Sequence, residues 1–350
     1  MKFGLFYLPS FYPEVKREPQ FYQEILEQVR FADAHGFHSV WLVEHHFLRH
    51  GGIIPSNFVL LAAMAVQTQR IRLGTGAVIL PFNDPVRVAE QGAMVDCLSG
   101  GRLDLGIGRG FQKLEFDAFE VRMDEARARL EEGIEIVKKC WTQEEVEHQG
   151  RFRRFGPIRV YPKPVQKPHP PIWVACFLSR ESFEWTATQG YNLLYVAYHV
   201  DPEVARERIG WYWNALKQSG GDWGQKEVLV CYHTYVAEPG TSVERLKEIV
   251  ARPLREYFQV AAEGFIPPDS ESYAQYAKMR QQFQERANFD VVYPQRVLMG
   301  TPEQILERIQ ELRALGATQI GLIPTFGTLP HEETMASLRR FVKYVLPHFQ

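Results

Sequence analysis

The sequence predicts a single (β/α)8 barrel over residues 1–350. Short apolar runs typical of buried strands alternate eight times with helical patterns, and neither a short-period repeat nor a shift in composition marks a second domain. One of these runs, residues 39–43, ends abruptly in Glu44, His45 and His46. A buried strand that carries a carboxylate and two imidazoles at its carboxyl end is typical of a barrel enzyme, because active sites of such barrels lie there.

The strands and helices follow in order along the chain. Strands are expected at residues 2–8, 39–43, 71–80, 102–108, 172–176, 193–197, 228–236 and 320–323. Proline, serine or threonine marks the start of most helices, which are expected at residues 19–35, 56–67, 85–97, 124–141, 182–189 and 202–218, from about residue 241, from residue 301, and at 331–346. Thr301 and Gln304 have the spacing of a capping box.

Two segments break this alternation. Residues 149–171 are rich in proline, which excludes pairing in a central strand, so we expect a hairpin or a covering loop. Residues 263–300, between the seventh and eighth strands, are long and irregular, which is typical of an active-site lid or a disordered loop, and we expect a lid. The charged residues of the helix at 124–141 are expected to form a solvated outer face.

Composition limits the setting in which the chain works. A net charge of −2 argues against nucleic acid or anionic lipid as a partner. The four cysteines lie far apart without a CxxC pair, which fits a reducing compartment and predicts neither a zinc knuckle nor a disulfide framework. No signal-type segment and no run near the ~20 apolar residues of a membrane span is present. We therefore expect a soluble, cytoplasmic protein.

Two other strand ends carry features that favour an anion. Arg109, between Gly108 and Gly110, can present its guanidinium where the backbone permits close approach. Residues 178–182 lead into a helix whose start offers hydroxyls and free amides. Together these features predict a phosphate site, whereas each alone also fits a carboxylate partner or a simple helix cap. Gly76, inside an apolar strand, indicates either a bulge or a kink that offers backbone to a flat ligand.

These residues stand in motifs that resemble a known family. The stretches MKFGLF, GFHSVWLVEHHF, RIRLGTGAVILPFNDPVRVAE, SGGRLDLGIGRG, ESFEWTATQG and MGTPEQILERI run from the first residues to the last strand. They resemble the bacterial luciferase-like family of flavin-dependent monooxygenases, and the catalytic subunit of bacterial luciferase in particular. The resemblance is specific for the superfamily and much less specific for the substrate.

The resemblance implies an activity and a set of site residues. Members bind reduced FMN, supplied by a separate flavin reductase, and add O2 to form a flavin 4a-hydroperoxide that oxidises a small organic substrate. His45 matches the catalytic acid/base, Glu44 its neighbouring carboxylate, and Gly76–Ala77 a non-proline cis peptide beneath the flavin ring. The remaining implied cofactor contacts are Phe6, Gly108, Arg109, Leu178, Ser179 and Ser182, of which Arg109 and the last three match the phosphate site. The apolar helix at 56–67 fits the family's dimer, so a homodimer is expected, with a heterodimer as the alternative.

The sequence also departs from luciferase and leaves alternatives open. Gly108 replaces a reactive cysteine, and Ala197, with Tyr198 beside it, stands where an aromatic residue is aligned, so neither light emission nor a long-chain aldehyde substrate follows. The alternatives are a deazaflavin- or FMN-dependent oxidoreductase that transfers hydride without O2, a non-catalytic flavin-binding protein, and a metal-dependent hydrolase. The side chains expected to form the metal site are Glu44, His45, His46 and His199, and those expected to select a substrate include Phe6, Tyr7, Phe111, Tyr198 and His233.

Overall fold

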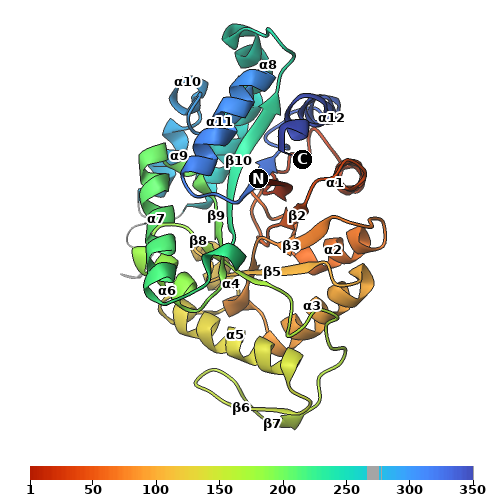
Figure 1. Cartoon of the computed structure of the whole chain (residues 1–350), viewed down its shortest axis with the longest axis vertical. Coiled ribbons are helices and arrows are strands. Elements are labelled where there is room, and N and C mark those ends of the chain that lie inside the picture. Colours follow the sequence, from red (N-terminus) through yellow and green to blue (C-terminus); the bar gives the residue numbers. More distant parts are fainter. Residues whose placement is uncertain (266–275, 277, 350) are drawn as a thin grey trace.

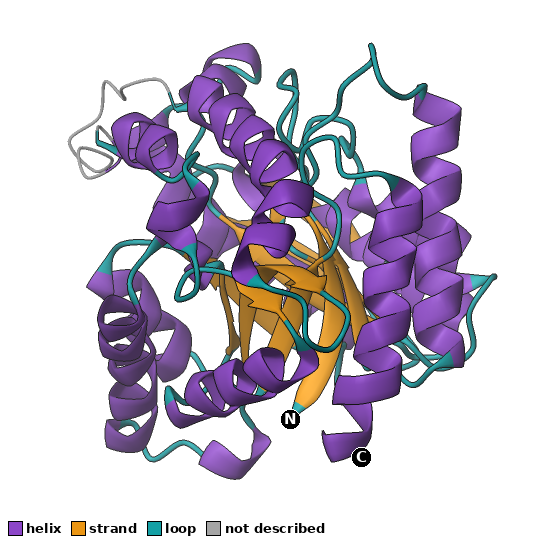
Figure 2. Ribbon diagram, turned by 90° about the horizontal axis from the view of Figure 1, so that it is seen from above, coloured by secondary structure: helices purple, strands orange, loops and turns teal. Residues whose placement is uncertain are grey.

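The predicted (β/α)8 barrel is confirmed by the computed structural model, which describes residues 1–265, 276 and 278–349. Parallel strands form a central barrel surrounded by helices, and both termini lie at the same end of it (Figures 1 and 2). Pairing of β12 with β1 and of β9 with β10 closes the sheet. Its strands are β1 (Lys2–Tyr7), β2 (Ser39–Leu42), β3 (Arg72–Thr75), β5 (Leu103–Gly108), β8 (Ile172–Cys176), β9 (Asn192–Tyr195), β10 (Val228–Val236) and β12 (Gln319–Ile323).

The third strand is interrupted. In place of one strand over residues 71–80, β3 is separated from a short β4 (Val78–Ile79) by a cis peptide bond between Gly76 and Ala77. At the interruption the side chain of Thr75 replaces backbone pairing, since its Oγ1 donates to the carbonyl of Gly106 at 2.6 Å and accepts from the Gly106 amide at 2.8 Å. The interruption thus keeps its hydrogen bonds and turns the backbone at the carboxyl end of the barrel.

The helices cover the outside of the barrel. They are α1 (Glu18–Ala34), α2 (Asn57–Ala65), α3 (Pro85–Ser99), α4 (Lys113–Ala118), α5 (Ala126–Thr142), α6 (Arg180–Thr188), α7 (Pro202–Gln218), α8 (Val243–Gly264), α11 (Pro302–Ala314) and α12 (His331–Arg340). The predicted capping box of α11 is confirmed, with Gln304 Oε1 accepting from the Thr301 amide at 2.9 Å. In the part of the chain that the structure describes, no helix is both long and apolar enough to cross a membrane.

The segment between the seventh and eighth barrel strands is more regular than its sequence suggests. It contains α9 (Met279–Glu285), α10 (Phe289–Val292) and β11 (Leu298–Gly300), and β11 extends the sheet by pairing with the end of β10. The prediction of an irregular segment over residues 263–300 is therefore wrong for these elements. Residues 266–275 and 277 of that segment lie outside the described residues.

The predicted hairpin is present, but it begins earlier than expected. Strands β6 (Val146–Gln149) and β7 (Arg154–Ile158) pair antiparallel and project beyond α5 (Figure 1). Glu132 on α5 anchors their turn, because its carboxylate accepts from the backbone amides of Phe152 and Arg153. The charged residues of α5 are thus not all solvated, contrary to the prediction.

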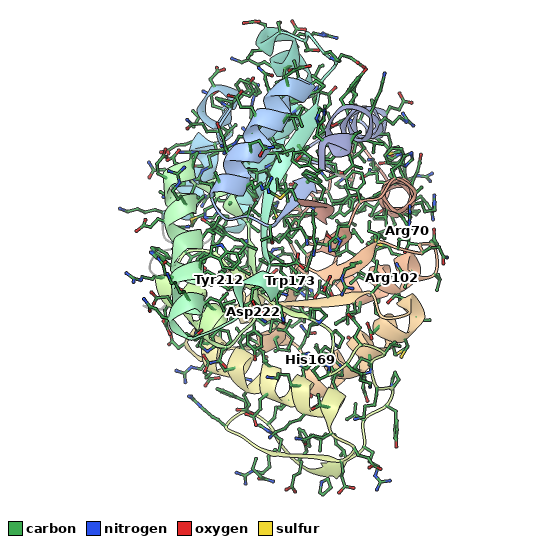
Figure 3. The ribbon with its side chains drawn as sticks, viewed as in Figure 1. Arg70, Arg102, His169, Trp173, Tyr212 and Asp222 are labelled. Atoms are coloured by element: carbon green, nitrogen blue, oxygen red, sulfur yellow. The ribbon has the colours of Figure 1, made fainter. Side chains whose placement is uncertain are left out.

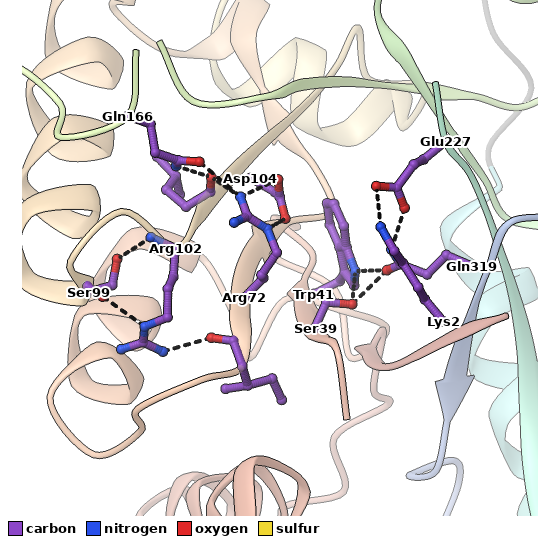
Figure 4. Close-up of polar contacts among 12 residues, drawn as sticks. Lys2, Ser39, Trp41, Arg72, Ser99, Arg102, Asp104, Gln166, Glu227 and Gln319 are labelled. Carbon is purple, nitrogen blue, oxygen red and sulfur yellow. Dashed lines mark hydrogen bonds and ion pairs between the residues drawn. The ribbon is translucent and has the colours of Figure 1, made fainter. Parts of the chain in front are cut away.

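A polar layer closes the amino-terminal end of the barrel (Figure 4). Arg72 donates two hydrogen bonds to the carboxylate of Asp104, at 2.7 and 2.8 Å. Trp41 Nε1 donates to Ser39 Oγ at 2.9 Å. Above this layer Trp41 packs edge to face on Trp173, which lies near the centre of the molecule in Figure 3. Because this end is filled, a ligand must enter from the carboxyl end.

Candidate active site

The carboxyl ends of the strands surround one large cavity. The space between its lining residues is about 1040 Å³ when the open solvent at its mouth is counted. All ten residues predicted to bind the cofactor or to act in catalysis border it, although they come from five strand ends and the start of α6. The barrel therefore brings the predicted site together.

His45 is held by a buried carboxylate. Its Nδ1 lies 2.9 Å from Oε1 of Glu115 on α4, and the same oxygen accepts from the backbone amide of His46 at 2.8 Å. Burial alone would lower the pKa of His45, but the charge and hydrogen bond of Glu115, with the charge of Glu44, outweigh it and raise that pKa. A proton on Nδ1 directed at Glu115 leaves Nε2 as the nitrogen that can exchange a proton with a ligand.

The loop after β2 folds back onto this imidazole. Gly51 has a positive φ of 78°, and a Cβ built on it would lie 2.6 Å from Cδ2 of His45. Only glycine meets both requirements, because other residues rarely adopt this backbone conformation and would collide with the ring. The loop thus packs closely on the His45 side chain, whose Nδ1 faces Glu115.

Glu44 connects two strand ends rather than facing His45. Its Oε2 accepts from the Ile79 amide at 3.2 Å, and its Oε1 accepts from Asn83 Nδ2 at 2.8 Å. His46 Nε2 lies 3.3 Å from the same Oε1, so the second imidazole pairs with Glu44. Glu44 borders the cavity, and its carboxylate binds the chain shortly after the cis peptide.

The cis peptide between Gly76 and Ala77, implied by the resemblance, is confirmed. A Cβ on Gly76 would lie 2.9 Å from the ring of Phe6, so the peptide packs directly against that ring. Both residues border the cavity, where the peptide offers a flat polar surface. This arrangement favours the kink over the bulge and suits a planar ring.

The opposite side of the cavity collects donors for an anion. Arg109 follows β5, and Ser179 and Ser182 stand at the start of α6 with their hydroxyl oxygens 2.7 Å apart. Arg127 on α5 extends from behind, with Nη2 3.4 Å from Ser182 Oγ. Guanidinium groups, hydroxyls and the amides of a helix start are groups that commonly bind phosphate in proteins. Arg127 corrects the prediction that the charges of this helix belong to the surface.

Aromatic side chains and a third imidazole form the remaining wall. Phe111, Phe177 and Phe265 come from the ends of β5, β8 and α8 and border the cavity together with His50. Of the side chains expected to select a substrate, Phe6, Phe111 and Tyr198 border the cavity, whereas Tyr7 and His233 lie outside it. Tyr7 instead donates to Gln28 at 2.8 Å.

Sequence reasoning missed Glu115, Arg127 and His50. Glu115 stands 70 residues from its partner His45 in a short helix without a pattern that points to a site. Arg127 lies in an amphipathic helix where charges are usually solvated. Of the three, only His50 carried a signal in the sequence, because it stands in the same loop as His45.

The four residues of the metal-site alternative do not converge. His45 faces Glu115 and His46 pairs with Glu44, while His199 directs Nδ1 at the carbonyl of Val196 and Nε2 at Arg208. Among the described residues, no three histidine, cysteine, aspartate or glutamate side chains are placed to hold a metal ion. The geometry does not support the hydrolase alternative.

Known proteins resemble the chain in sequence and fold. The family model of luciferase-like monooxygenases matches residues 1–319. The oxygenase component of the flavin-dependent trigonelline monooxygenase of Acinetobacter baylyi is 29% identical over 100% of this chain and 96% of its own length. Monooxygenase RslO1 from Streptomyces bottropensis is 34% identical, with a TM-score of 0.84 and 100% of both chains covered.

More distant structures show the fold alone. The oxygenating constituent of 3,6-diketocamphane monooxygenase from Pseudomonas putida, in complex with FMN, is 20% identical with a TM-score of 0.80 over 100% and 99% of the chains. An F420-dependent secondary alcohol dehydrogenase is 16% identical with a TM-score of 0.75 over 99% and 98%. The family model spans most of the sequence and agrees with the barrel, so this chain belongs to the luciferase-like monooxygenases.

Proposed function

We propose that the chain is the oxygenase of a two-component system, which takes reduced FMN from a separate flavin reductase and inserts one oxygen atom of O2 into a small organic substrate. The observation that carries the proposal is a single cavity bordered both by guanidinium and hydroxyl groups and by His45, which is paired with the buried Glu115. The guanidinium and hydroxyl donors suit the phosphate of a flavin, and Gly76 and Ala77 border the same cavity. When bound, reduced FMN would supply the electrons that activate O2.

The phosphate side sets the position of the cofactor. Arg109, Arg127 and the hydroxyls of Ser179 and Ser182 would bind the phosphate through charge-assisted hydrogen bonds. Leu178 and Gly108 border the same cavity. The ring would then lie along Gly76–Ala77, within reach of the second strand end.

His45 would manage the proton of the reaction. Glu115 fixes Nδ1, so Nε2 can give a proton to the oxidised product or take one from the substrate. A raised pKa keeps a larger protonated fraction near neutral pH, which suits an acid. The aromatic wall would exclude water, which preserves a reactive cofactor against unproductive release of hydrogen peroxide.

Helices α2 and α3 would form a homodimer interface. They pack side by side (Figure 1) and expose Val59, Val66, Met94 and Leu98, each at least 50% accessible. Arg102 connects the ends of the two helices by donating to the carbonyls of Ala65, at the end of α2, and Ser99, at the end of α3. A second copy of the same face is the occupant that the family resemblance suggests.

The experiment is anaerobic mixing of the protein with photoreduced FMN, followed by rapid mixing with oxygenated buffer. We expect the return of oxidised flavin absorbance and the release of hydrogen peroxide to be slowed at least tenfold relative to free reduced FMN. Arg109→Ala serves as a control that weakens cofactor binding. Reoxidation at the free rate with saturating protein would contradict the proposal, and anaerobic substrate turnover would favour the hydride-transferring alternative.

A further inference from the structure

Three phenylalanine rings in the cavity wall lie nearly parallel. Phe111 stacks on Phe177 with ring centroids 5.6 Å apart and planes 17° apart, and on Phe265 at 5.4 Å and 18°. The ring of Tyr276, in the same wall, also lies parallel to that of Phe111, at 5.7 Å and 11°. The phenylalanine rings come from three separate elements, so local sequence does not impose their alignment. Offset parallel rings are a favoured arrangement for aromatic groups, and a further flat ring can extend such a stack.

Contacts with neighbouring residues hold two rings of this stack in place. The Phe177 ring lies 4.1 Å from the ring of His199, and its backbone carbonyl accepts from Arg208 Nη1 at 2.8 Å. Phe265 ends the long helix α8 and is buried. His45 stands edge to face on Phe111, with planes 78° apart, so the imidazole of the candidate active site adjoins the stack.

His50 provides a polar contact in the same cavity. It is buried, and Nδ1 lies 3.3 Å from Ser10 Oγ, while the ring packs edge to face on Tyr257 at 5.0 Å. Among the described residues Nε2 has no hydrogen-bond partner, so it is the nitrogen left for a ligand. Burial, with the nearby His45 and His233, lowers the pKa of His50 well below its ordinary value, so the ring stays neutral. Neutral Nε2 can hydrogen bond to an uncharged polar group.

We infer that the substrate of this site is a planar aromatic molecule with a hydroxyl or similar uncharged hydrogen-bonding substituent, whose ring extends the Phe111 stack and whose substituent is held by His50. The inference rests on the proposed function, because it assigns the space beside the cofactor to the substrate. A flexible alkyl chain would gain nothing from parallel rings beyond the burial of its surface, whereas a flat ring also gains stacking.

The test measures binding by equilibrium dialysis, without turnover. FMN affinity is measured first, on the full chain. The FMN-saturated protein is then dialysed against three probes: 2-naphthol, decahydro-2-naphthol, which keeps the hydroxyl and loses the aromatic rings, and naphthalene, which keeps the rings and loses the hydroxyl. We expect 2-naphthol to bind about tenfold more tightly than decahydro-2-naphthol.

Two variants separate the ring from the hydroxyl. His50→Phe should weaken 2-naphthol about tenfold through the lost hydrogen bond and leave naphthalene within about twofold. Phe111→Leu should weaken both aromatic probes equally and spare decahydro-2-naphthol. His35→Phe, at an exposed histidine after α1, is the matched control and should change none of these affinities. FMN affinity and the unfolding temperature of each variant establish that it is folded.

Several results would overturn the inference. Equal affinity for 2-naphthol and decahydro-2-naphthol would exclude an aromatic slot. Equal loss of 2-naphthol and naphthalene in His50→Phe would remove His50 from the site of the hydroxyl. Displacement of FMN by 2-naphthol would indicate that the parallel rings bind the flavin ring and not the substrate. Absence of FMN binding would instead contradict the proposed function, while the expected probe pattern without FMN would still support the aromatic slot.

Discussion

At the scale of single residues, the charge state of His45 depends on one distant carboxylate. Glu115→Gln keeps the shape and a hydrogen-bond acceptor for Nδ1 but removes the charge, while burial of His45 remains. Because burial lowers and Glu115 raises the pKa of His45, we expect its pKa to fall in this variant. The measurement is an NMR titration of the His45 ring, assigned by comparison with His45→Ala.

The control for this titration is Glu181→Gln. Glu181 is an exposed carboxylate at the start of α6 that pairs with Arg127 at 3.4 Å, so its loss should leave the His45 titration unchanged. An unaltered His45 pKa in Glu115→Gln would show that Glu115 does not set the charge of the imidazole.

His45→Ala itself should retain FMN and lose substrate oxidation, and oxidation at the parental rate would remove His45 from catalysis.

Two arginines of α5 offer a matched pair for the phosphate site. Arg127 borders the cavity, whereas Arg129, two residues later, pairs with Glu125 at 2.9 Å and lies away from it. Arg127→Ala, like Arg109→Ala, should weaken FMN by about tenfold or more, because a charge-assisted hydrogen bond contributes ~1.5–3 kcal/mol. Riboflavin, which lacks the phosphate, should bind equally well to all variants. Fluorescence titration with both flavins makes the comparison.

An equal loss of FMN and riboflavin would place Arg127 or Arg109 elsewhere than at the phosphate. Arg129→Ala should leave both titrations unchanged, which separates a specific contact from a general loss of positive charge on this helix. A weakening of FMN by Arg129→Ala to the same degree would indicate such a general effect.

Some site residues could be predicted because they stand at strand ends. His45 and Arg109 each stand within three residues of a strand end, so the strand pattern alone places them at the carboxyl end of the barrel. Glu115 and Arg127 could not be found in this way, since neither follows an apolar run: Glu115 contacts His45 from α4, and Arg127 borders the cavity from α5. Their positions depend on the tertiary fold, which the local sequence pattern does not predict.

At the scale of elements, the apolar face of α2 and α3 predicts association. The double variant Val66→Asp, Met94→Asp places charges on two exposed apolar positions of this face and should convert a dimer into a monomer. Light scattering after gel filtration measures the mass. Val291→Asp, at an exposed valine of α10, changes a comparable side chain elsewhere and should leave the mass unchanged.

A wild-type chain that is already monomeric at micromolar concentration would contradict the assignment of this face. A dimer that survives the double variant would place the interface on another surface. A loss of FMN affinity together with the monomer would further indicate that association supports the cavity, since α3 follows the strand with the cis peptide.

Element boundaries were predicted closely where apolar runs are short and bounded. The expected strands at residues 172–176 and 228–236 match β8 and β10 residue for residue. The break between β3 and β4 was hidden inside a continuous apolar run, because a cis peptide leaves no periodicity to detect. The helices α9 and α10 were missed because each is too short to show a helical period.

At the scale of the whole molecule, acid should destabilise the barrel through buried histidines. His233 is fully buried against Tyr198, Tyr257 and Phe258, and neither ring nitrogen has a hydrogen-bond partner among the described residues. Burial lowers its pKa to about 3. In the unfolded chain this histidine binds a proton below pH ~6.5, whereas in the folded chain it stays neutral until about pH 3. The free energy of unfolding therefore falls as the pH falls through this interval.

His233→Leu should remove this loss. From pH 6.5 to pH 5 one such histidine accounts for ~2 kcal/mol of unfolding free energy, at ~1.4 kcal/mol per pH unit. Replacing His233 by leucine removes no hydrogen bond. The free energy of unfolding of the variant should therefore equal that of the wild type at pH 7 and exceed it at pH 5. Urea unfolding of both proteins at the two pH values measures the difference. Other buried histidines, such as His50 and His199, remain in both proteins, so parallel losses of stability would show that His233 is not the group that acid titrates.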